Sequence, residues 1–455
     1  MSVLEILALC LPALINDAPL VYPDTRSYFL GGRAAVEKAA GWFAGGMSGA
    51  GAGQIDATLH KARGVRSAFY ALFTYIPAVS VSLWLVIVLQ AVIVAAMLRL
   101  LFNLVCPGRE NWQATAFIVA LSLLTTVSWA TSNVMPDIFT AIMALGVIIT
   151  LVFWQQLSGW KRRAVFLAMV GGLVMHLTNL PIAAGLLIVG AIIIHENLWT
   201  QRGRYLLIIQ ALAVSVAALL AVGVVGFHEW TVAPQSPPFL LARSLRDGPG
   251  RLYLQENCPG IGLDMCKHLD KLDQATSRFL WDDDGVYSAV SAEEEAQLRA
   301  EDKRIYVAAA LEFPWLQAKA MARNALLQLI TFTIHEYYIP SSADYDRTGM
   351  TLHMPDQAPW QTYVSIVEYT IVIGSLGFIG LTWRRGLGRD LKRVSLLVIT
   401  TALLEAAAGA ISEPVPRYEA RVIWLIPMAA LLIWSASRRG ANAAAPASAA
   451  PRGGL

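Results

Sequence analysis

The sequence predicts an all-α integral membrane protein, and composition and patterning carry that prediction. Of 455 residues, 56% are hydrophobic and 15% are charged, whereas a soluble domain carries about 25% charged residues. Mean hydropathy is +0.53. The apolar residues fall in blocks of about 20, the length that a helix needs to cross ~30 Å of hydrocarbon. A net charge of +3 is too small to suggest a nucleic-acid partner.

The blocks predict a bundle of about ten transmembrane helices. The first block lacks the basic start of a signal peptide, having Glu5 there, so it is taken as the first helix. The second is longer than one span, which indicates tilt or a start in the interface. The expected spans are 2–16, 71–101, 113–131, 137–155, 163–177, 181–195, 205–227, 361–383, 394–411 and 421–437.

Lysine and arginine set the predicted orientation. They gather in alternate connections, most densely at 161–163 and 384–393, whereas the short connections 132–136 and 178–180 carry none. Cytoplasmic loops are the ones enriched in these residues. The sequence therefore predicts a multi-pass protein of a bacterial cytoplasmic (inner) membrane, with both termini in the cytoplasm.

Two long segments then face outward. The first, 17–70, contains a candidate amphipathic surface helix at 33–44. The second, 228–360, is too polar to span and is expected to fold mostly as helices, including 292–312 and 314–334.

The predicted organisation has four parts, of which the last is an Ala/Pro/Gly-rich tail expected to be disordered. These parts are a transmembrane module at 1–227, the extracytoplasmic segment 228–360, transmembrane helices at 361–437 and the tail 438–455.

Four cysteines are present. Cys10 and Cys106 belong to apolar blocks, whereas Cys258 and Cys266 lie in the large polar segment. The latter pair would close a small disulfide loop in an oxidising compartment. Two unpaired small residues are the alternative.

Acidic residues follow the first helix, in the stretch Asn16-Asp17-Ala18-Pro19 and on to Asp24. A carboxylate at the outer membrane surface can act as a general base, or bind a metal, beside a lipid-anchored substrate. Asn, Asp and Pro are also turn residues, so a helix terminator followed by a turn is an equal alternative.

A second acidic position, Asp137, lies between two apolar blocks at the same predicted depth as Asp24. Asn133 or Asp137 could simply cap a helix, with Pro136 in its first turn. The shared depth and side of the two aspartates favours the functional interpretation.

Two arginines, Arg417 and Arg421, precede the last span on the outer side, against the charge trend. Arginine recognises phosphate through its planar, bidentate fork. The alternative is an interfacial anchor in which Arg417 pairs with Glu413 or Glu419 and Tyr418 joins the aromatic belt.

The remaining polar motifs are weaker. His176 and Asn179 lie at the outer end of the fifth span, where a lone histidine is more often structural. Asp282-Asp283-Asp284-Gly285 could hold calcium but lacks a spaced ligand pattern, which favours a solvated turn. His335-Glu336-Tyr337-Tyr338 could line an outer cavity. HExxH, GxSxG, Walker and GxGxxG patterns do not occur.

These motifs resemble those of the GT-C superfamily of polytopic glycosyltransferases, which use polyprenyl-phosphate-linked sugars. The resemblance rests on Tyr22-Pro23-Asp24-Thr25-Arg26-Ser27-Tyr28 after the first helix, on Met135-Pro136-Asp137, and on Arg417-Tyr418 after a large outer segment. The first motif has an Asp-x-x-x-Tyr spacing in place of the paired Asp-Glu of several relatives, which leaves the choice of aspartate open.

The resemblance implies an active site at the outer membrane face. Asp24 would be the catalytic base, Asp17 the other candidate, and Asp137 an orienting acid. The implied substrate-binding residues are Arg26, Tyr28, Arg66, His176, Asn179, Arg417, Tyr418 and Arg421. Its partners would be a polyprenyl-phosphate sugar donor, a glycan or lipid acceptor and membrane lipids, and transfer would invert the anomeric carbon. A divalent cation, Mg or Mn, is an open alternative to metal-free catalysis.

Three other classes of function compete. A transporter or flippase of a lipid-linked saccharide predicts charges deep within helices, where Glu405 is the clearest case. A polysaccharide polymerase or ligase would share the substrates and the outer site. A non-catalytic scaffold predicts that Asp24→Asn changes nothing but expression.

Overall fold

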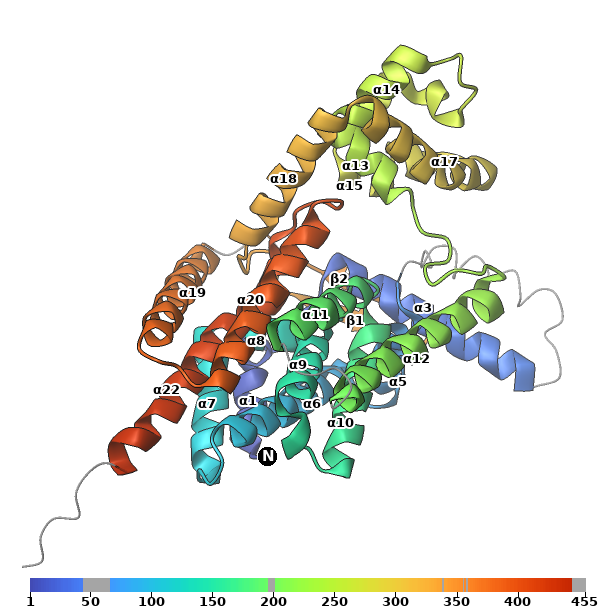
Figure 1. The fold of residues 1–455 in the computed structure, drawn as a ribbon. Helices are drawn as coiled ribbons and strands as arrows, with labels where there is room; N and C mark the ends of the chain where they lie inside the picture. The colour runs from blue at the N-terminus through green and yellow to red at the C-terminus, as the bar shows by residue number, and fades with distance from the viewer. Residues whose placement is uncertain (44–65, 195–200, 338, 355, 357–358, 444–455) are drawn as a thin grey trace, which may run out of the picture.

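The computed structural model describes residues 1–43, 66–194, 201–337, 339–354, 356 and 359–443. Its secondary structure is almost wholly helical, as predicted. Figure 1 shows a large helical body and, at one end of it, a smaller group of helices, residues 239–330, which we call the cap domain.

Helices from the first half of the chain make one side of the body. They are α1 (Val3–Leu9), α2 (Leu11–Ile15), α3 (Pro23–Phe43), α5 (Ala68–Ser80), α6 (Leu83–Val105), α7 (Asn111–Leu124), α8 (Val127–Ser132), α9 (Ile138–Phe153), η1 (Trp154–Gln156), α10 (Gly159–Met175), α11 (Asn179–Ile194) and α12 (Arg202–Phe227).

Several predicted spans are broken into two helices. The block 71–101 becomes α5 and α6, which are separated at Val81, and 113–131 becomes α7 and α8. Pro77, Ser80 and Ser82 lie near the first break, and Thr125 and Thr126 lie at the second, but the mean hydropathy of each block does not show them. The surface helix expected at 33–44 begins earlier, at Pro23, so that Asp24 lies in the first turn of α3. Gly32 lets α3 approach the backbone of α5 at Ala71, where a side chain would not fit.

Helix α9 is the centre of the body. Every one of its residues is buried, and α6, α10, α11, α12, α20 (Arg389–Gly409) and α21 (Pro416–Ile423) pack against it. A helix that is apolar all round is expected to be enclosed in this way. Because Asp137 immediately precedes α9, its carboxylate lies in the interior of the body, at the N-terminal end of this helix.

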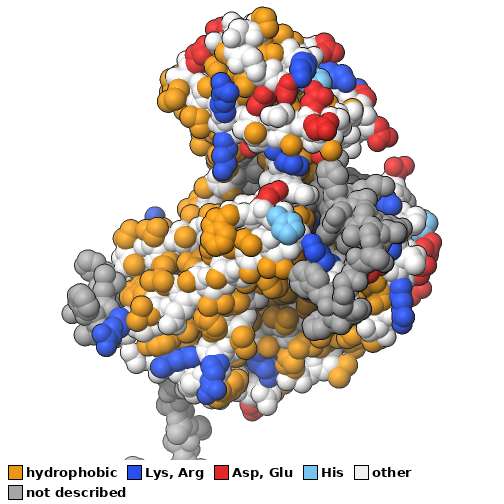
Figure 2. Space-filling model, turned by 90° about the vertical axis from the view of Figure 1, so that its right-hand side faces the viewer, with side chains coloured by type: hydrophobic (Ala, Val, Ile, Leu, Met, Phe, Trp, Pro, Cys, Tyr) orange, Lys and Arg blue, Asp and Glu red, His pale blue; other side chains and the backbone are white. Residues whose placement is uncertain are grey.

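Five helical runs within the described part of the chain are long and apolar enough to cross a membrane. They are Leu83–Val105, Ile138–Gln156, Arg202–Phe227, Trp360–Arg384 (α19) and Pro416–Ser437, the last made of α21 and most of α22 (Leu425–Ala443). Shorter apolar helices are α5, α7 and α11. Figure 2 shows that the body presents mainly apolar side chains on the face drawn there, whereas charged side chains gather over the cap domain.

The cap domain has its own apolar core. Its helices are α13 (Phe239–Asp247), α14 (Pro249–Asn257), η2 (Asp264–Lys271), α15 (Thr276–Trp281), α16 (Val286–Ala289), α17 (Ala292–Glu312) and α18 (Pro314–Ile330). Cys258 and Cys266 form a disulfide in the connection that follows α14. Helix α17 has the bounds that the sequence predicts.

The end of the predicted outer segment returns to the body. An antiparallel hairpin of β1 (Ser342–Tyr345) and β2 (Met350–His353), which was not predicted from the sequence within this mainly helical segment, packs against α3. The Asn16 amide donates to Ser341 O at 2.7 Å and accepts from Ser341 N at 3.0 Å. Ser341 is thereby held beside the segment that leads to Asp24. At the other end of the chain, α22 runs to Ala443 through part of the predicted tail, and 444–455 lie outside the described residues.

Candidate functional site

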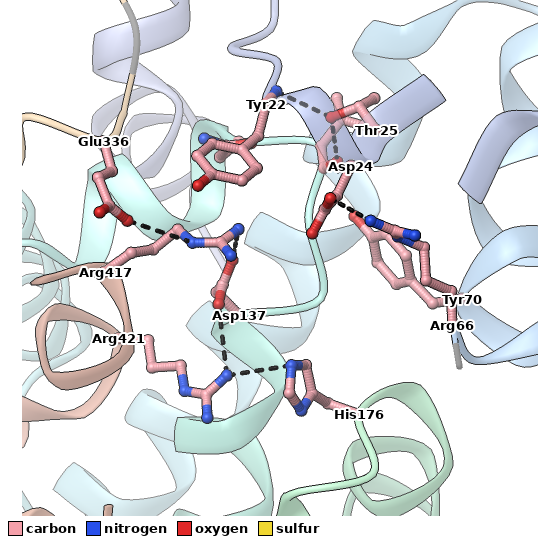
Figure 3. A network of polar contacts seen from close by, with 12 residues as sticks. Tyr22, Asp24, Thr25, Arg66, Tyr70, Asp137, His176, Glu336, Arg417 and Arg421 are labelled. Atoms are coloured by element: carbon pink, nitrogen blue, oxygen red, sulfur yellow. Dashed lines mark hydrogen bonds and ion pairs between the residues drawn. The ribbon is translucent and has the colours of Figure 1, made fainter. Parts of the chain in front are cut away.

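A backbone pairing joins the two acidic motifs. Leu20 N donates to Ser132 O at 3.0 Å, and Val134 N donates to Leu20 O at 2.8 Å. The Thr25 hydroxyl then donates to Val134 O at 3.0 Å and accepts from Tyr22 N at 2.9 Å. The start of α3 and the start of α9 are therefore locked side by side, which brings Asp24 and Asp137 into one network (Figure 3).

Asp24 is the accessible acid of this network. Its carboxylate forms an ion pair with Arg66, which precedes α5, and 33% of its side chain is exposed. The Arg66 guanidinium carbon lies 5.9 Å from the ring centroids of both Tyr28 and Trp281, the latter in the cap domain. Arg66 thus orients Asp24 and joins it to α15.

Asp137 is buried and bound by two arginines. Its carboxylate accepts from Arg417 Nη1 at 3.2 Å and from Arg421 Nη1 at 3.4 Å, and its side chain is 1% exposed. Although Asp137 occupies the N-cap position of α9, its side chain makes no capping hydrogen bond. The capping explanation is therefore wrong, because the carboxylate neutralises guanidinium groups instead.

Arg421 is enclosed on all sides. It donates to Glu405 Oε1 at 2.6 Å, to Thr178 Oγ1 at 3.0 Å and contacts His176 Nε2 at 3.2 Å. These contacts tie α21 to α20 and to the connection between α10 and α11. Burial of an arginine among two carboxylates is what a low-dielectric interior requires of a charged group.

Arg417 is slightly more exposed than Arg421, and the Tyr22 ring covers its guanidinium. The Tyr22 ring centroid is 3.9 Å from the guanidinium carbon, and Glu336 Oε2 is 3.9 Å from Arg417 Nε. The residue itself is 3% exposed. The interfacial anchor with Glu413 or Glu419 is therefore wrong, since the ion-pair partners are Asp137 and Glu336.

Glu336 is the residue of the site that the sequence did not single out. Burial raises the pKa of its carboxyl to about 7, although the charge of Arg417 acts in the opposite direction. It lies between α18 and β1, in a short polar and aromatic run between two apolar helices. That composition was the only feature of the sequence that pointed to Glu336, because its contact with α21 arises from the tertiary fold.

The other predicted residues lie around the network or outside it. Tyr28 and Tyr418 border the network. The ring centroid of Tyr418 lies 5.4 Å from the guanidinium carbon of Arg417 and 4.9 Å from that of Arg421. Asp17 and Arg26 are exposed and lie outside the contacts drawn in Figure 3. The Asn179 amide donates to Gly172 O at 2.7 Å, so this side chain stabilises the end of α10.

An apolar cavity of about 500 Å³ is lined by Arg66, the ion-pair partner of Asp24. It lies between α3, α5 and the end of α12 that is nearest the cap domain, and its walls include Gly31, Leu72 and Val222. Arg66 and Lys38 are its basic residues, and Lys38 donates to Gly226 O at 2.9 Å. Because Arg66 both lines the cavity and binds Asp24, the apolar space and the accessible carboxylate adjoin.

The carboxylates of the site do not form a metal-binding group. Among the residues that the structure describes, no three His, Cys, Asp or Glu side chains are arranged to hold a metal ion. Asp24 and Asp137 are instead each engaged by arginine. In the candidate calcium turn, Asp284 pairs with Arg278.

Comparison of the chain with protein-family models, with curated proteins and with solved structures gives no match in any of the three.

Proposed function

We propose that this protein is a membrane glycosyltransferase. It would transfer a sugar from a polyprenyl-phosphate donor to a glycan or lipid acceptor of the cell envelope, at the outer face of the cytoplasmic membrane. The observation that carries this proposal is that Arg66 lines an apolar cavity and also binds the accessible Asp24 carboxylate. The cavity would hold the apolar tail of such a substrate, and Arg66 and Asp24 would lie beside its charged, sugar-bearing head.

The chemistry needs one accessible base. Asp24 would accept the proton of an acceptor hydroxyl as its oxygen attacks the anomeric carbon. The bond from that carbon to the phosphate oxygen breaks, and the phosphate leaves with the bonding electron pair. A single displacement inverts the anomeric carbon. Asp137 would not take part directly, because it is buried and held by two arginines.

We propose the orientation of the protein in the membrane from the distribution of its basic residues and from the disulfide. Basic residues at the end of the body opposite the cap domain include Arg389, which lines a hollow with Val105 and Phe153, the final residues of α6 and α9. Arginine-rich ends face the cytoplasm. The Cys258–Cys266 disulfide favours an oxidising compartment for the cap domain. On this arrangement about ten helical crossings are expected.

The test is transfer by the purified protein from a panel of polyprenyl-phosphate sugars, with product identified by mass. Asp24→Asn should lower turnover at least about 100-fold, since general-base catalysis contributes roughly 10²–10⁴. Asp17→Asn is the matched control, because Asp17 is exposed and lies outside the network, and it should keep wild-type turnover. Equal activity of wild type and Asp24→Asn would refute the assignment of the base.

Transport of a lipid-linked saccharide is the second candidate. Glu368, within α19, is 3% exposed, and its carboxyl lies beside Thr126 without an ion-pair partner among the described residues. Buried ionisable groups in membrane helices often mark transport pathways. Flipping of a labelled polyprenyl-phosphate sugar in proteoliposomes, lost in Glu368→Gln and retained in Asp24→Asn, would favour this function over transfer.

A further inference from the structure

The carboxylate of Glu336, from another part of the chain, lies at the N-terminus of helix α21. The helix spans Pro416–Ile423, and the backbone N–H of Arg417, in its first turn, acts to lower the pKa of the Glu336 carboxyl that lies beside it. The free N–H groups at a helix N-terminus, together with the helix dipole, favour a bound anion. Glu336, from a distant connection, supplies that anion in this structure.

The Arg417 side chain beside it has an unused donor. Arg417 Nε is buried without a hydrogen-bond partner among the described residues, and Glu336 Oε2 lacks one as well. Their separation of 3.9 Å is too long for a hydrogen bond. Tyr22 covers one face of the guanidinium at 3.9 Å. The site therefore attracts an anion, but Glu336 fills it with poor geometry.

We infer that Glu336 plugs a phosphodiester-binding site formed by Arg417 and the N-terminus of α21, and that the substrate phosphate enters when Glu336 becomes protonated. This inference rests on the proposed function. A phosphate oxygen can approach Nε closely and accept the hydrogen bond that Glu336 leaves unmade, as arginine–phosphate pairs do. Glu336, 23% exposed at its side chain, lies at the accessible edge of the site.

Charge balance explains the coupling to a proton. Arg417 faces Glu336 from α21, Asp137 faces it from the start of α9, Glu413 from the connection before α21, and Tyr22 from the segment before α3. An entering phosphodiester adds one negative charge to this set. Uptake of one proton by Glu336 removes one, so the charge of the network stays constant. Because burial places the Glu336 pKa at about 7, this uptake takes place near neutral pH.

The experiment measures binding of farnesyl methyl phosphate to the full-length protein in nanodiscs. The probe is a phosphodiester with one charge at every pH used, so any pH dependence arises in the protein. Between about pH 6 and about pH 8, wild-type affinity should fall by up to about tenfold, as linkage to a group of pKa about 7 requires. Farnesol, which has the same chain without the phosphate, should bind with an affinity independent of pH.

Three variants distinguish the effect of Glu336 from the effects of neighbouring charged residues. Glu336→Gln should bind the phosphodiester at every pH about as tightly as wild type does at pH 6. Glu413→Gln, a matched loss of a nearby carboxyl, should keep the fall in affinity with rising pH, at a slightly lower midpoint because the Glu413 charge helps to raise the pKa of Glu336. Arg417→Lys should weaken binding of the phosphodiester and leave farnesol binding unchanged.

The outcomes against the inference are distinct from those against the proposed function. A constant wild-type affinity across the pH range, or pH dependence that persists in Glu336→Gln, overturns the plug while leaving the lipid site in place. Failure of both farnesol and the phosphodiester to bind overturns the inference together with the lipid site on which the proposed function depends.

Discussion

Arg421 and Asp137 form an ion pair inside the body, with Arg421 Nη1 3.4 Å from Asp137 Oδ1 and both side chains 1% exposed. This contact connects helix α21 near the end of the chain to the start of the central helix α9. It is enclosed by Glu405, Thr178 and His176. The pair therefore fixes the geometry of the site, and its removal should show first in stability.

Loss of one partner of this pair should be strongly destabilising. Arg421→Met should lower the free energy of unfolding by about 3–5 kcal/mol, because it leaves the buried Glu405 carboxylate without a counter-charge and Asp137 with Arg417 alone. Thermal unfolding in detergent measures the change. Glu37→Gln, which breaks the Arg33–Glu37 pair, is the control and should cost less than about 1 kcal/mol. Similar small losses in both variants would contradict the structural role.

Trp281 of the cap domain should act through Arg66. Its ring lies 5.9 Å from the guanidinium carbon, a contact worth about 0.5–2 kcal/mol. In the transfer assay, Trp281→Ala should lower kcat by about threefold to tenfold at little change in unfolding temperature. Trp281→Phe should restore most of the loss. If Phe were no better than Ala, the aromatic contact would have no part in placing Arg66.

Asp302 of the cap domain should make stability depend on pH. Burial raises the pKa of its carboxyl to about 6, while the backbone N–H groups of Leu241, which donates to it at 2.7 Å, and of Leu240 act in the opposite direction. The unfolded chain has the lower value, so the folded state prefers the protonated acid. The associated stability is present below the unfolded pKa and is lost as pH rises through about 6.

Asp302→Asn keeps an acceptor for the Leu241 amide without the charge. Its stability relative to wild type should therefore increase between about pH 5 and about pH 8, by on the order of 1–3 kcal/mol. Hydrogen exchange of the α13 amides in the full-length protein measures this difference. A difference that is the same at every pH would show that Asp302 is ionised in both states.

The disulfide should stabilise the cap domain. Cys258 and Cys266, eight positions apart, close a short loop, for which chain entropy predicts about 2–3 kcal/mol. Reductant should lower the unfolding temperature of the wild type. It should have no effect on the Cys258→Ser/Cys266→Ser double variant, which should unfold at the temperature of the reduced wild type. Equal unfolding of the oxidised and reduced wild type would contradict this.

Hydropathy was sufficient for the helices but not for their breaks. The predicted spans correspond to helices because an apolar block of that length must satisfy its backbone within itself. The breaks at Val81 and between α7 and α8 lie close to Pro77 and at Thr125-Thr126, which an average over a whole apolar block does not resolve. The hairpin after Ser341 was missed because its partner surface is on α3, far away in the sequence.

The candidate site was predicted in its parts and not in its connections. Asp24, Asp137, Arg417 and His176 were identified because charged and polar residues are rare beside apolar blocks. That both arginines bind Asp137, and that Arg66 and not Arg417 binds Asp24, could not follow from spacing. Glu336 was named only as part of a run that could line an outer cavity, because nothing in its local sequence distinguishes it from an ordinary Glu in a polar connection.

By itself the sequence determined the class of the protein, since long apolar blocks with basic flanks are stable only as helices in a membrane. It also determined which residue types lie near the ends of those helices. Only the tertiary structure decided which acid is accessible and which is buried, and which carboxylate meets Arg417. These outcomes depend on contacts between segments hundreds of residues apart, and the strength of each charge interaction depends on a burial that no local stretch of sequence encodes.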